Sequence, residues 1–507
     1  MRIPFVIAAM LAAVLLVHLF VRAPVYPYTP DSAGYIEQAR NLVAHGKAIS
    51  GPYDLSEDVA LPSRLFPVGF AVVLAALSLT GIEPATLATA TGWAAAAALP
   101  LLLFAAFRRV VGEWSALVVA VLSALSPGIL TFAGFALSDL LALLLAVGAI
   151  GLALNDQRAA TWFAAGLLAG LSYAIRNASL ALLIAFAMYF AWQFFFPFER
   201  KRPVERFLAF AIGVAVFVVP VLVRNLWVFG ELNPYQMAPS TVGVEQNVRA
   251  YIQEFVYDFT AVRNVGRLVA WSAPGLAAAG VILLLLLYSL RQRVHRLPAI
   301  RRDALVLCGA YTLLGAAVVI AARSRYEWGE LINTRHTLQV IPFFTVTLLV
   351  LWPIEVPGRI GPVRRGWQGI VAVICAMHVM YASVLDGQRI HVDRRGQGAL
   401  DALEVGATYM CSGADGAIPL SNWAYVFVIE CAAKVRQFEP GGGGIASAMN
   451  ELVQSRPRTA WRVALFPGRA GVTAHDLPLS ESVRAGLEND GWVVVRNDAR
   501  GLIASRF

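Results

Sequence analysis

Charged residues and cysteines are scarce in this sequence, and several familiar site motifs are missing. Only 14% of the 507 residues are Asp, Glu, Lys or Arg, against about 25% in soluble proteins. The four cysteines form no CxxC pair, and the seven histidines show no HExxH or similar ligand spacing. PGGGG at 440–444 has neither the GxGxxG nor the GK[ST] context of a phosphate loop. These absences argue against an ordinary soluble domain, a zinc site and a nucleotide site.

Apolar residues are abundant instead. They make up 58% of the chain, and the mean hydropathy is +0.64, which together predict a mainly α, polytopic membrane protein. The net charge of +9 could indicate nucleic acid or anionic lipid as a partner. The densest basic clusters, at 198–206, 291–302 and 359–365, are flanked by apolar runs. That is typical of cytoplasmic loops, so we expect contact with membrane lipid and no nucleic acid.

About eleven transmembrane helices are predicted from the apolar runs. A further apolar segment, 66–80, is short and carries Pro67 and Gly69 near its start. If 66–80 stays outside as a juxtamembrane helix, the richest basic clusters all fall on the cytoplasmic side, whereas a crossing there would invert every later loop. The predicted spans are 3–22, 84–107, 113–131, 138–154, 159–175, 178–197, 207–223, 268–290, 304–322, 337–353 and 368–385.

This topology predicts a multi-pass protein of the plasma (inner) membrane with two domains. Residues 1–385 form the transmembrane domain, with a cytoplasmic N-terminus and an outer loop at 23–83. Residues 386–507 alternate helix-like and strand-like pieces, which predicts a small extracytoplasmic α/β domain. In an oxidising periplasm its cysteines, Cys411 and Cys431, could form a disulfide.

Two carboxylates belong to the outer face in this topology. Asp31 is the third residue of TPDSAGYIEQARNLV at 29–43, whose periodicity predicts a short amphipathic helix ending at His45-Gly46. Asp139 begins an apolar span. Either acid could simply be an N-cap. Ionisable groups at membrane depth are costly and usually functional, however, so the pair could supply a general base and an orienting partner.

Cationic residues are predicted on the same face. Each alone could be an interface anchor, but several beside carboxylates predict an anion site, since the planar guanidinium donates two parallel hydrogen bonds to phosphate. The candidate phosphate-binding residues are Arg176, Arg224, Arg325, Arg335 and His336, and the candidate substrate-binding residues are Tyr35, Arg64 and Asn225.

The ordered segments resemble those of the GT-C glycosyltransferases over roughly residues 1–350. The resemblance rests on DSAGYIEQARNL, LFPVGFAVVLAAL, SPGILTFAGFALSDLL, GLLAGLSYAIRNASLALL, VRNLWVFGELNP and TRHTLQVIPFF, which keep the order seen in the protein mannosyltransferase and aminoarabinose transferase group. Arg335–His336 fall where relatives often have Arg-Tyr.

The resemblance implies a hexosyl- or pentosyltransferase that uses a polyprenyl-phosphate-linked sugar. It implies that Asp31 is the catalytic acid of the first outer loop, that Asp139 is the acid of the second, and that the anomeric carbon is inverted. No cofactor is required, because arginines can supply positive charge, although some members use a divalent ion. The acceptor would be a glycan, a lipid or a protein.

Two other classes of membrane protein fit part of the pattern. A transporter or flippase of lipid-linked sugars would also have many spans and outer cations, but the sequence shows no internal repeat. An O-antigen ligase-like enzyme also uses outer arginines and lipid-phosphate donors. The paired outer acids favour a GT-C enzyme over both.

Overall fold

The computed structural model divides the chain into two compact units. The first comprises residues 1–23 and 90–385, and the second comprises residues 24–89 and 386–507. The residues that the structure describes are 3–21, 24, 26–50, 62, 64, 66–195, 203–235, 237–272, 274–275, 277, 297–326, 332–352, 362–384, 399–400, 402–411, 417–431, 435–438, 444–455, 460–467 and 477–506.

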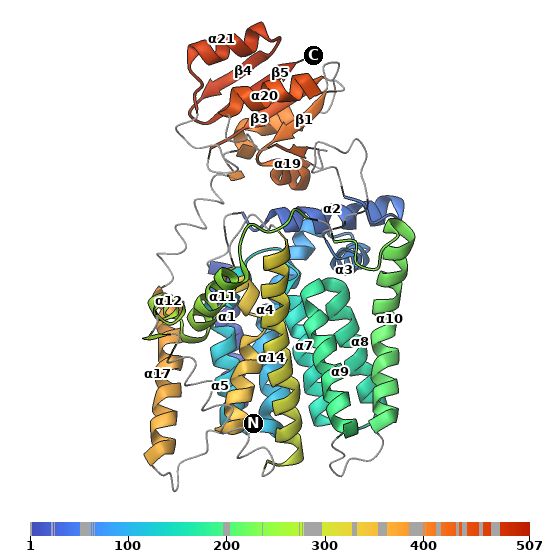
Figure 1. The fold of residues 1–507 in the computed structure, drawn as a ribbon, viewed down its shortest axis with the longest axis vertical. Helices are drawn as coiled ribbons and strands as arrows, with labels where there is room; N and C mark the ends of the chain where they lie inside the picture. Colours follow the sequence, from blue (N-terminus) through green and yellow to red (C-terminus); the bar gives the residue numbers. More distant parts are fainter. Residues whose placement is uncertain are drawn as a thin grey trace. The chain divides into compact units, whose positions relative to one another are not determined.

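Helices build the first unit, and the long ones run side by side (Figure 1). Five described helices are long and apolar enough to cross a membrane, and shorter apolar helices accompany them. The elements are α1 (Ile3–Val21), α4 (Pro84–Val111, which starts in the second unit), α5 (Glu113–Ala124), α6 (Pro127–Phe132), α7 (Asp139–Asn155), α8 (Ala159–Ile175), η1 (Asn177–Ser179), α9 (Leu180–Phe195), α10 (Pro203–Phe229), α11 (Val244–Thr260), α12 (Arg263–Trp271), α14 (Ala299–Arg325), α15 (Thr334–Thr337), α16 (Ile341–Leu351) and α17 (Pro362–Val384).

The predicted polytopic α fold is confirmed, with one local difference. The predicted span 113–131 is two helices, because the Ser126 side chain accepts a hydrogen bond from the Ile129 N–H at 3.3 Å and Pro127 occupies the first turn of α6. The span 268–290 lies largely outside the described residues. The other predicted spans each coincide with a described helix, although the total number of membrane crossings stays a prediction.

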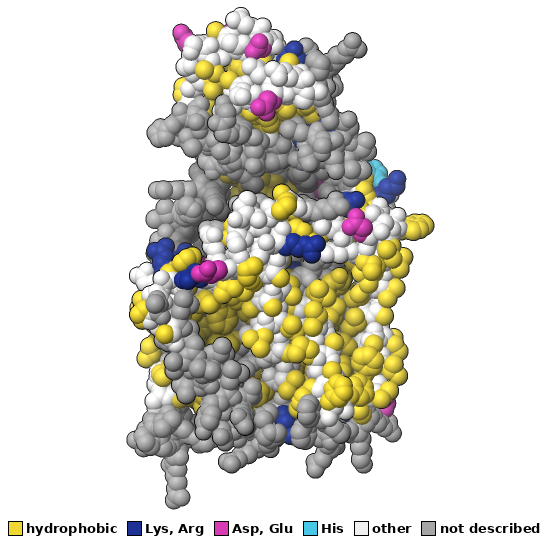
Figure 2. Space-filling view, viewed as in Figure 1, with side chains coloured by type: hydrophobic (Ala, Val, Ile, Leu, Met, Phe, Trp, Pro, Cys, Tyr) yellow, Lys and Arg dark blue, Asp and Glu magenta, His cyan; other side chains and the backbone are white. Residues whose placement is uncertain are grey.

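The surface of α10 fits a lipid environment. Its exposed side chains include Leu208, Ile212, Val216, Val219 and Val223, each about half exposed, and they recur every three or four residues along one face. Hydrophobic side chains cover this helix and its neighbours in Figure 2. Such a stripe would be unfavourable in water and is stable against acyl chains.

Glycines allow α8 and α10 to pack closely. A Cβ at Gly166 would lie 2.2 Å from the carbonyl oxygen of Phe210, and one at Gly213 would lie 2.3 Å from that of Phe163. The rings of Trp162, Phe186 and Phe210 pack beside this crossing. This contact fixes α8, whose C-terminal end carries a candidate site residue.

The second unit combines the outer loop with a small sheet domain. Its helices are α2 (Pro30–His45) and α3 (Val68–Ser78), followed in the C-terminal part by a helix at 402–410, α19 (Ala424–Cys431), α20 (Gly444–Ser455) and α21 (Glu481–Asn489). The strands β1 (Ile418–Ser421), β2 (Arg436–Gln437), β3 (Trp461–Leu465), β4 (Val493–Asp498) and β5 (Gly501–Arg506) form one sheet in the order β2-β1-β3-β5-β4.

The sheet is mixed. β1 pairs in parallel with β2 and β3, whereas β5 pairs antiparallel with β3 and β4. Apolar side chains of the strands, including Val463 and Leu502, pack with Met449 of α20 and Leu487 of α21. The predicted small α/β domain is therefore present. The predicted border at residue 385 does not describe the whole division, since residues 24–89 group with the C-terminal part, where side chains of the α2 region contact α19.

Candidate active site

Asp139 is the centre of a buried cluster of charges in the first unit. It lies in the first turn of α7, and 1% of its side chain is exposed. Oδ1 accepts from Arg176 Nη1 at 2.6 Å, while Arg335 approaches both carboxylate oxygens with Nε at 3.1–3.2 Å and Nη2 at 3.1 Å. The structure thus brings together three candidate residues that are far apart in the sequence.

The residues that meet at Asp139 lie at or near helix ends. Arg176 lies where α8 ends and η1 begins, and Arg335 lies in α15, a single helical turn. The backbone carbonyl of Asp139 also accepts a hydrogen bond from Gln339 Nε2 at 2.7 Å. Both carboxylate oxygens are occupied by guanidinium groups, so this geometry suits an anchor for arginines better than a free base.

α15 is formed by its own sequence, NTRH. Asn333 is the N-cap, and its side chain accepts from the backbone N–H of Arg335 at 3.0 Å. His336 completes a capping box with the Asn333 backbone. This small helix presents Arg335 and His336 together.

His336 also contacts Arg323, a buried residue in the last turn of α14. Burial, followed by the charges of Arg323, Arg335 and Arg176, holds the pKa of His336 well below its usual value. The imidazole is therefore neutral. Because a guanidinium can only donate, Nε2 accepts from Arg323, and Nδ1 lies 3.2 Å from both the backbone nitrogen and the carbonyl oxygen of Asn333.

Among the described residues of this cluster, guanidiniums outnumber carboxylates. Arg176, Arg323 and Arg335 contribute three guanidiniums, and Asp139 supplies one carboxylate. Arg176 and Arg335 side chains are each 14% exposed, and the buried Nε of Arg176 makes no hydrogen bond within the part of the chain that the structure describes. Buried guanidiniums that converge on one place can bind an anion such as a phosphate.

Two predicted phosphate-binding residues lie elsewhere. Arg224 Nη1 donates to Asn225 Oδ1 at 3.3 Å, and its guanidinium lies 5.5 Å from the centre of the Phe229 ring. Asn225 in turn donates to the Leu232 carbonyl at 3.1 Å. The guanidinium of Arg325 lies over the Tyr326 ring at 5.3 Å. Among the described residues, neither arginine has an ion pair with Asp139.

Sequence reasoning missed a second buried acid, Asp258 of α11. Its Oδ1 accepts from the Gly128 N–H at 2.7 Å and its Oδ2 from the Thr337 hydroxyl at 3.0 Å, and Ser126 also donates to it. Burial raises the pKa of Asp258 to about 7, although these hydrogen bonds oppose the shift. Asp258 therefore links α11 to α6 and to α15, which carries Arg335.

A signal for Asp258 was present in the sequence. The buried stripe of α11 contains Asn247, Tyr251, Glu254 and Asp258, which recur at the i, i+4, i+7 and i+11 positions of a helix. Polar residues at such positions face the interior and must be paired there.

Asp31, the candidate base, lies in the first turn of α2 and is half-buried. The prediction that Asp31 caps the helix is wrong. Thr29 is the N-cap, because Thr29 and Ser32 exchange hydrogen bonds in a capping box and Pro30 occupies the first turn. The predicted end of the helix is confirmed, since Gly46 takes the left-handed conformation with φ of 65°.

The other candidate residues of the outer loop have different surroundings. Tyr35 is buried, and its ring packs edge-on against Phe66 and Phe70 at 5.4 and 5.1 Å. A Cβ at Gly34 would meet the Phe66 ring at 2.4 Å, so α2 packs tightly on this aromatic pair. Arg64, shortly before α3, is half-buried.

Cys411 is disulfide-bonded, whereas Cys308 and Cys375 are free thiols. The side chain of Cys431, its predicted partner, lies outside the described residues. Within the part of the chain that the structure describes, no three His, Cys, Asp or Glu side chains gather to hold a metal ion.

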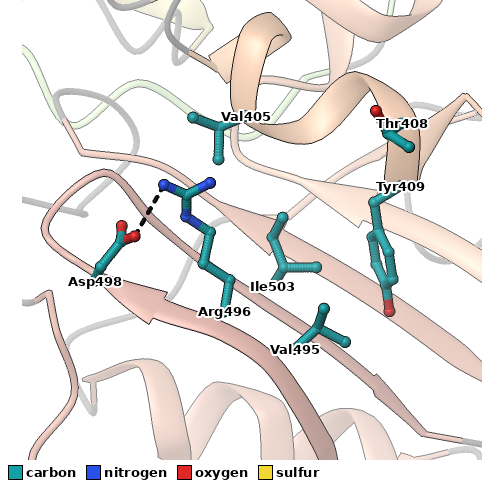
Figure 3. Close-up of a pocket in the computed structure, with 7 residues that line it drawn as sticks. All are labelled: Val405, Thr408, Tyr409, Val495, Arg496, Asp498 and Ile503. Carbon is teal, nitrogen blue, oxygen red and sulfur yellow. Dashed lines mark ion pairs between the residues drawn. The ribbon is translucent and has the colours of Figure 1, made fainter.

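The sheet domain carries an open pocket of about 440 Å³ (Figure 3). None of the candidate residues lines it. Arg496 and Asp498 form an ion pair of 2.8 Å on its wall, so their charges compensate each other. The pocket is lined by Val405, Thr408, Tyr409, Val495, Arg496, Asp498 and Ile503.

Comparison with solved structures identifies the fold. No model of a known protein family matches the sequence, and no curated protein matches it in sequence. ArnT from Cupriavidus metallidurans bound to undecaprenyl phosphate is similar in structure, with a TM-score of 0.57 and 15% identity over 98% of this chain and 97% of that one.

Two further solved structures are similar to this chain. AglB, an oligosaccharyltransferase from Archaeoglobus fulgidus in complex with an inhibitory peptide and a dolichol-phosphate, has a TM-score of 0.54 and 12% identity over 91% of this chain and 69% of that one. The arabinofuranosyltransferase AftD from Mycobacteria has a TM-score of 0.55 and 15% identity over 98% of this chain and 39% of that one. The chain therefore shares its fold with these three structures.

Proposed function

We propose that this protein transfers a sugar from a polyprenyl-phosphate donor to an acceptor at the extracytoplasmic face of the membrane. The observation that carries the proposal is the buried cluster in which Arg176 and Arg335 converge on Asp139, set in a fold shared with glycosyltransferases. ArnT, one of those structures, was solved with undecaprenyl phosphate, and AglB with a dolichol-phosphate. A polyprenyl phosphate has two parts that suit this unit. Its apolar chain can pack against the lipid-facing helices, and its phosphate can bind the arginines.

The cluster would act on the leaving group. When the bond between the anomeric carbon and the phosphate oxygen breaks, a negative charge develops on that phosphate. Arg176 and Arg335 are already oriented by Asp139, so they can stabilise this charge without reorganising during the reaction. Asp139 then serves as a positioning residue for the arginines.

Asp31 would act on the acceptor. Its carboxylate takes the proton of an acceptor hydroxyl or amine while the acceptor oxygen or nitrogen forms the new bond to the anomeric carbon. Attack opposite the departing phosphate inverts that carbon. Asp31 lies in the first turn of α2, behind the capping box of Thr29 and Ser32, and this helix start holds its backbone in place.

Orientation in the membrane follows from the basic loops. The N-terminus is cytoplasmic in this proposal, and the C-terminal domain is periplasmic, because the richest basic clusters then face the cytoplasm.

A transfer assay tests the proposal. Purified protein in lipid nanodiscs is incubated with labelled polyprenyl-phosphate sugars and with separate lipid, glycan and protein fractions as acceptors. We expect labelled product with at least one acceptor, and a loss of about 10²–10³-fold in kcat in Arg335→Ala. Arg267→Ala, an exposed arginine of α12, is the matched control.

The same protein in sealed vesicles tests the rival class. Movement of lipid-linked sugar across the bilayer, without formation of a glycosidic product, would contradict the proposal and favour a flippase.

A further inference from the structure

Arg40 of α2 contacts both α19 and Glu83, the residue that precedes α4. Its Nε and Nη2 donate to Glu83 Oε1 at 3.0 and 2.7 Å. Its Nη1 donates to the Val428 carbonyl at 2.9 Å, and Nη2 also donates to the Ile429 carbonyl at 2.7 Å. One guanidinium thus contacts a side chain ahead of α4 and two backbone groups of α19.

These contacts involve groups at two helix ends, the N-cap residue of α4 and the C-terminal carbonyls of α19. The second carboxylate oxygen of Glu83 accepts from the N–H groups of Ala85 and Thr86 at 2.6 and 3.2 Å, so Glu83 caps the start of α4. Val428 and Ile429 lie in the last turn of α19. Carbonyls there lack intrahelical partners and carry the negative end of the helix dipole, which a guanidinium stabilises.

Aromatic contacts join the same elements a second time. Tyr26, which precedes α2 and is 4% exposed, packs against Tyr28 and Tyr425 at ring distances of 5.2 and 6.2 Å. Tyr425 lies in the first turn of α19. The α2 region is therefore fixed to both ends of α19, by a ring contact at one end and by Arg40 at the other.

Arg40 cannot contact the atoms that react at Asp31. Arg40 follows Asp31 by nine residues on one helix, which corresponds to a rise of about 13.5 Å and a turn of about half a circle. The two side chains therefore leave opposite faces of α2. Any effect of Arg40 on Asp31 must pass through the position of the helix.

We propose that Arg40 is a positioning residue through which the C-terminal domain fixes α2, and with it the candidate base. The C-terminal domain then has a role that its sequence did not reveal: α19 is a rigid support for the first outer helix. This inference rests on the proposed function for Asp31, whereas the attachment of α2 to α19 stands on the contacts alone.

The test combines kinetics with hydrogen exchange on the full-length protein in nanodiscs. In Arg40→Ala we expect amide exchange in α2 to accelerate at least about tenfold, with unchanged protection of β3 and β5. The kcat for sugar transfer should fall by about 10–100-fold, since small misplacements of a catalytic group have such effects, while the KM for the donor stays within about twofold. Arg40→Lys should recover part of the loss, because an ammonium can reach the carbonyls but lacks the fork that also binds Glu83.

Arg484→Ala is the matched control, since Arg484 forms an exposed i,i+4 pair with Glu488 on α21 of the same unit. If Arg40→Ala does not fold, Glu83→Gln replaces it, because glutamine keeps a cap for α4 and removes the charge opposite Arg40. Wild-type exchange in α2 together with wild-type kcat in these variants would overturn the inference. If the wild-type protein transfers no sugar, the proposed function fails, and α2 exchange in the variants still decides whether Arg40 holds α2 to α19.

Discussion

Removal of the Asp139 carboxylate should destabilise the helical unit far more than removal of a surface acid. Asp139 is 1% exposed and binds two guanidiniums that are each 14% exposed. Loss of one partner of a buried pair typically costs 3–5 kcal/mol, because the other charge stays buried without compensation. We therefore expect Asp139→Ala to lower the free energy of unfolding by about 4 kcal/mol.

Denaturant unfolding in mixed micelles measures this change, followed by a probe of tertiary structure. Glu488→Ala is the control, because the Arg484–Glu488 pair is 48% and 43% exposed and should contribute about 0.3–0.5 kcal/mol. Asp139→Asn should be intermediate, since the amide keeps one oxygen acceptor but no charge.

A double-mutant cycle then separates the pair from general damage. Asp139→Ala combined with Arg335→Ala should cost clearly less than the two single changes added together, because the double variant leaves one fewer uncompensated cation. Equal costs for Asp139→Ala and Glu488→Ala, or strict additivity in the cycle, would refute the reasoning that Asp139 anchors the arginines.

Three further predictions concern the packing and charge around this cluster. Burial raises the pKa of Asp258 to about 7, above the value of about 3.9 for an unfolded Asp, so the native state binds the proton more tightly and stability falls as pH rises from about 4 to 7, by as much as about 4 kcal/mol; Asp258→Asn should flatten this dependence in unfolding experiments, and an unchanged slope would contradict it. Gly166→Ala should cost about 1–3 kcal/mol in the same unfolding assay, because the new Cβ would lie 2.2 Å from a carbonyl of α10. Gly366→Ala in α17, with nothing within 4 Å of the new Cβ, should not destabilise the protein, because alanine has the higher helix propensity. Arg323→Ala should weaken donor binding about tenfold in a competition assay with undecaprenyl phosphate, and an equal effect of Arg325→Ala would show that burial beside His336 does not matter.

The sequence predicted the fold class and several members of the cluster around Asp139, because both depend on signals that are local or additive along the chain. Apolar runs predicted the helices, and the alternation after residue 386 predicted the sheet domain. The helix over 30–45 ended where its glycine indicated. Asp139, Arg176, Arg335 and His336 were each predicted for the outer face, and the structure brings them together.

The remaining features depend on which face of a helix packs inward. Arg323 and Arg325 are two residues apart, so they lie on different sides of α14, and only tertiary packing decides that Arg323 is the buried one. The N-cap of α2 is Thr29 and not the predicted Asp31, because the side chains of Thr29 and Ser32 accept hydrogen bonds from each other's backbone N–H groups. Asp258 lies 79 residues from Thr337 and 130 from Gly128 in the sequence. Local sequence patterns do not predict hydrogen bonds between residues so far apart.

The measurement that tests the central claim most directly is the rate of sugar transfer by Asp31→Asn, with donor affinity measured on the same preparation. Asparagine preserves the shape of the side chain and cannot accept the acceptor's proton. We predict that kcat falls by about 10²–10⁴-fold, while undecaprenyl phosphate binds as tightly as in the wild type and the fold of α2 is unchanged by hydrogen exchange. Transfer by Asp31→Asn at the wild-type rate would contradict the assignment of Asp31 as the base.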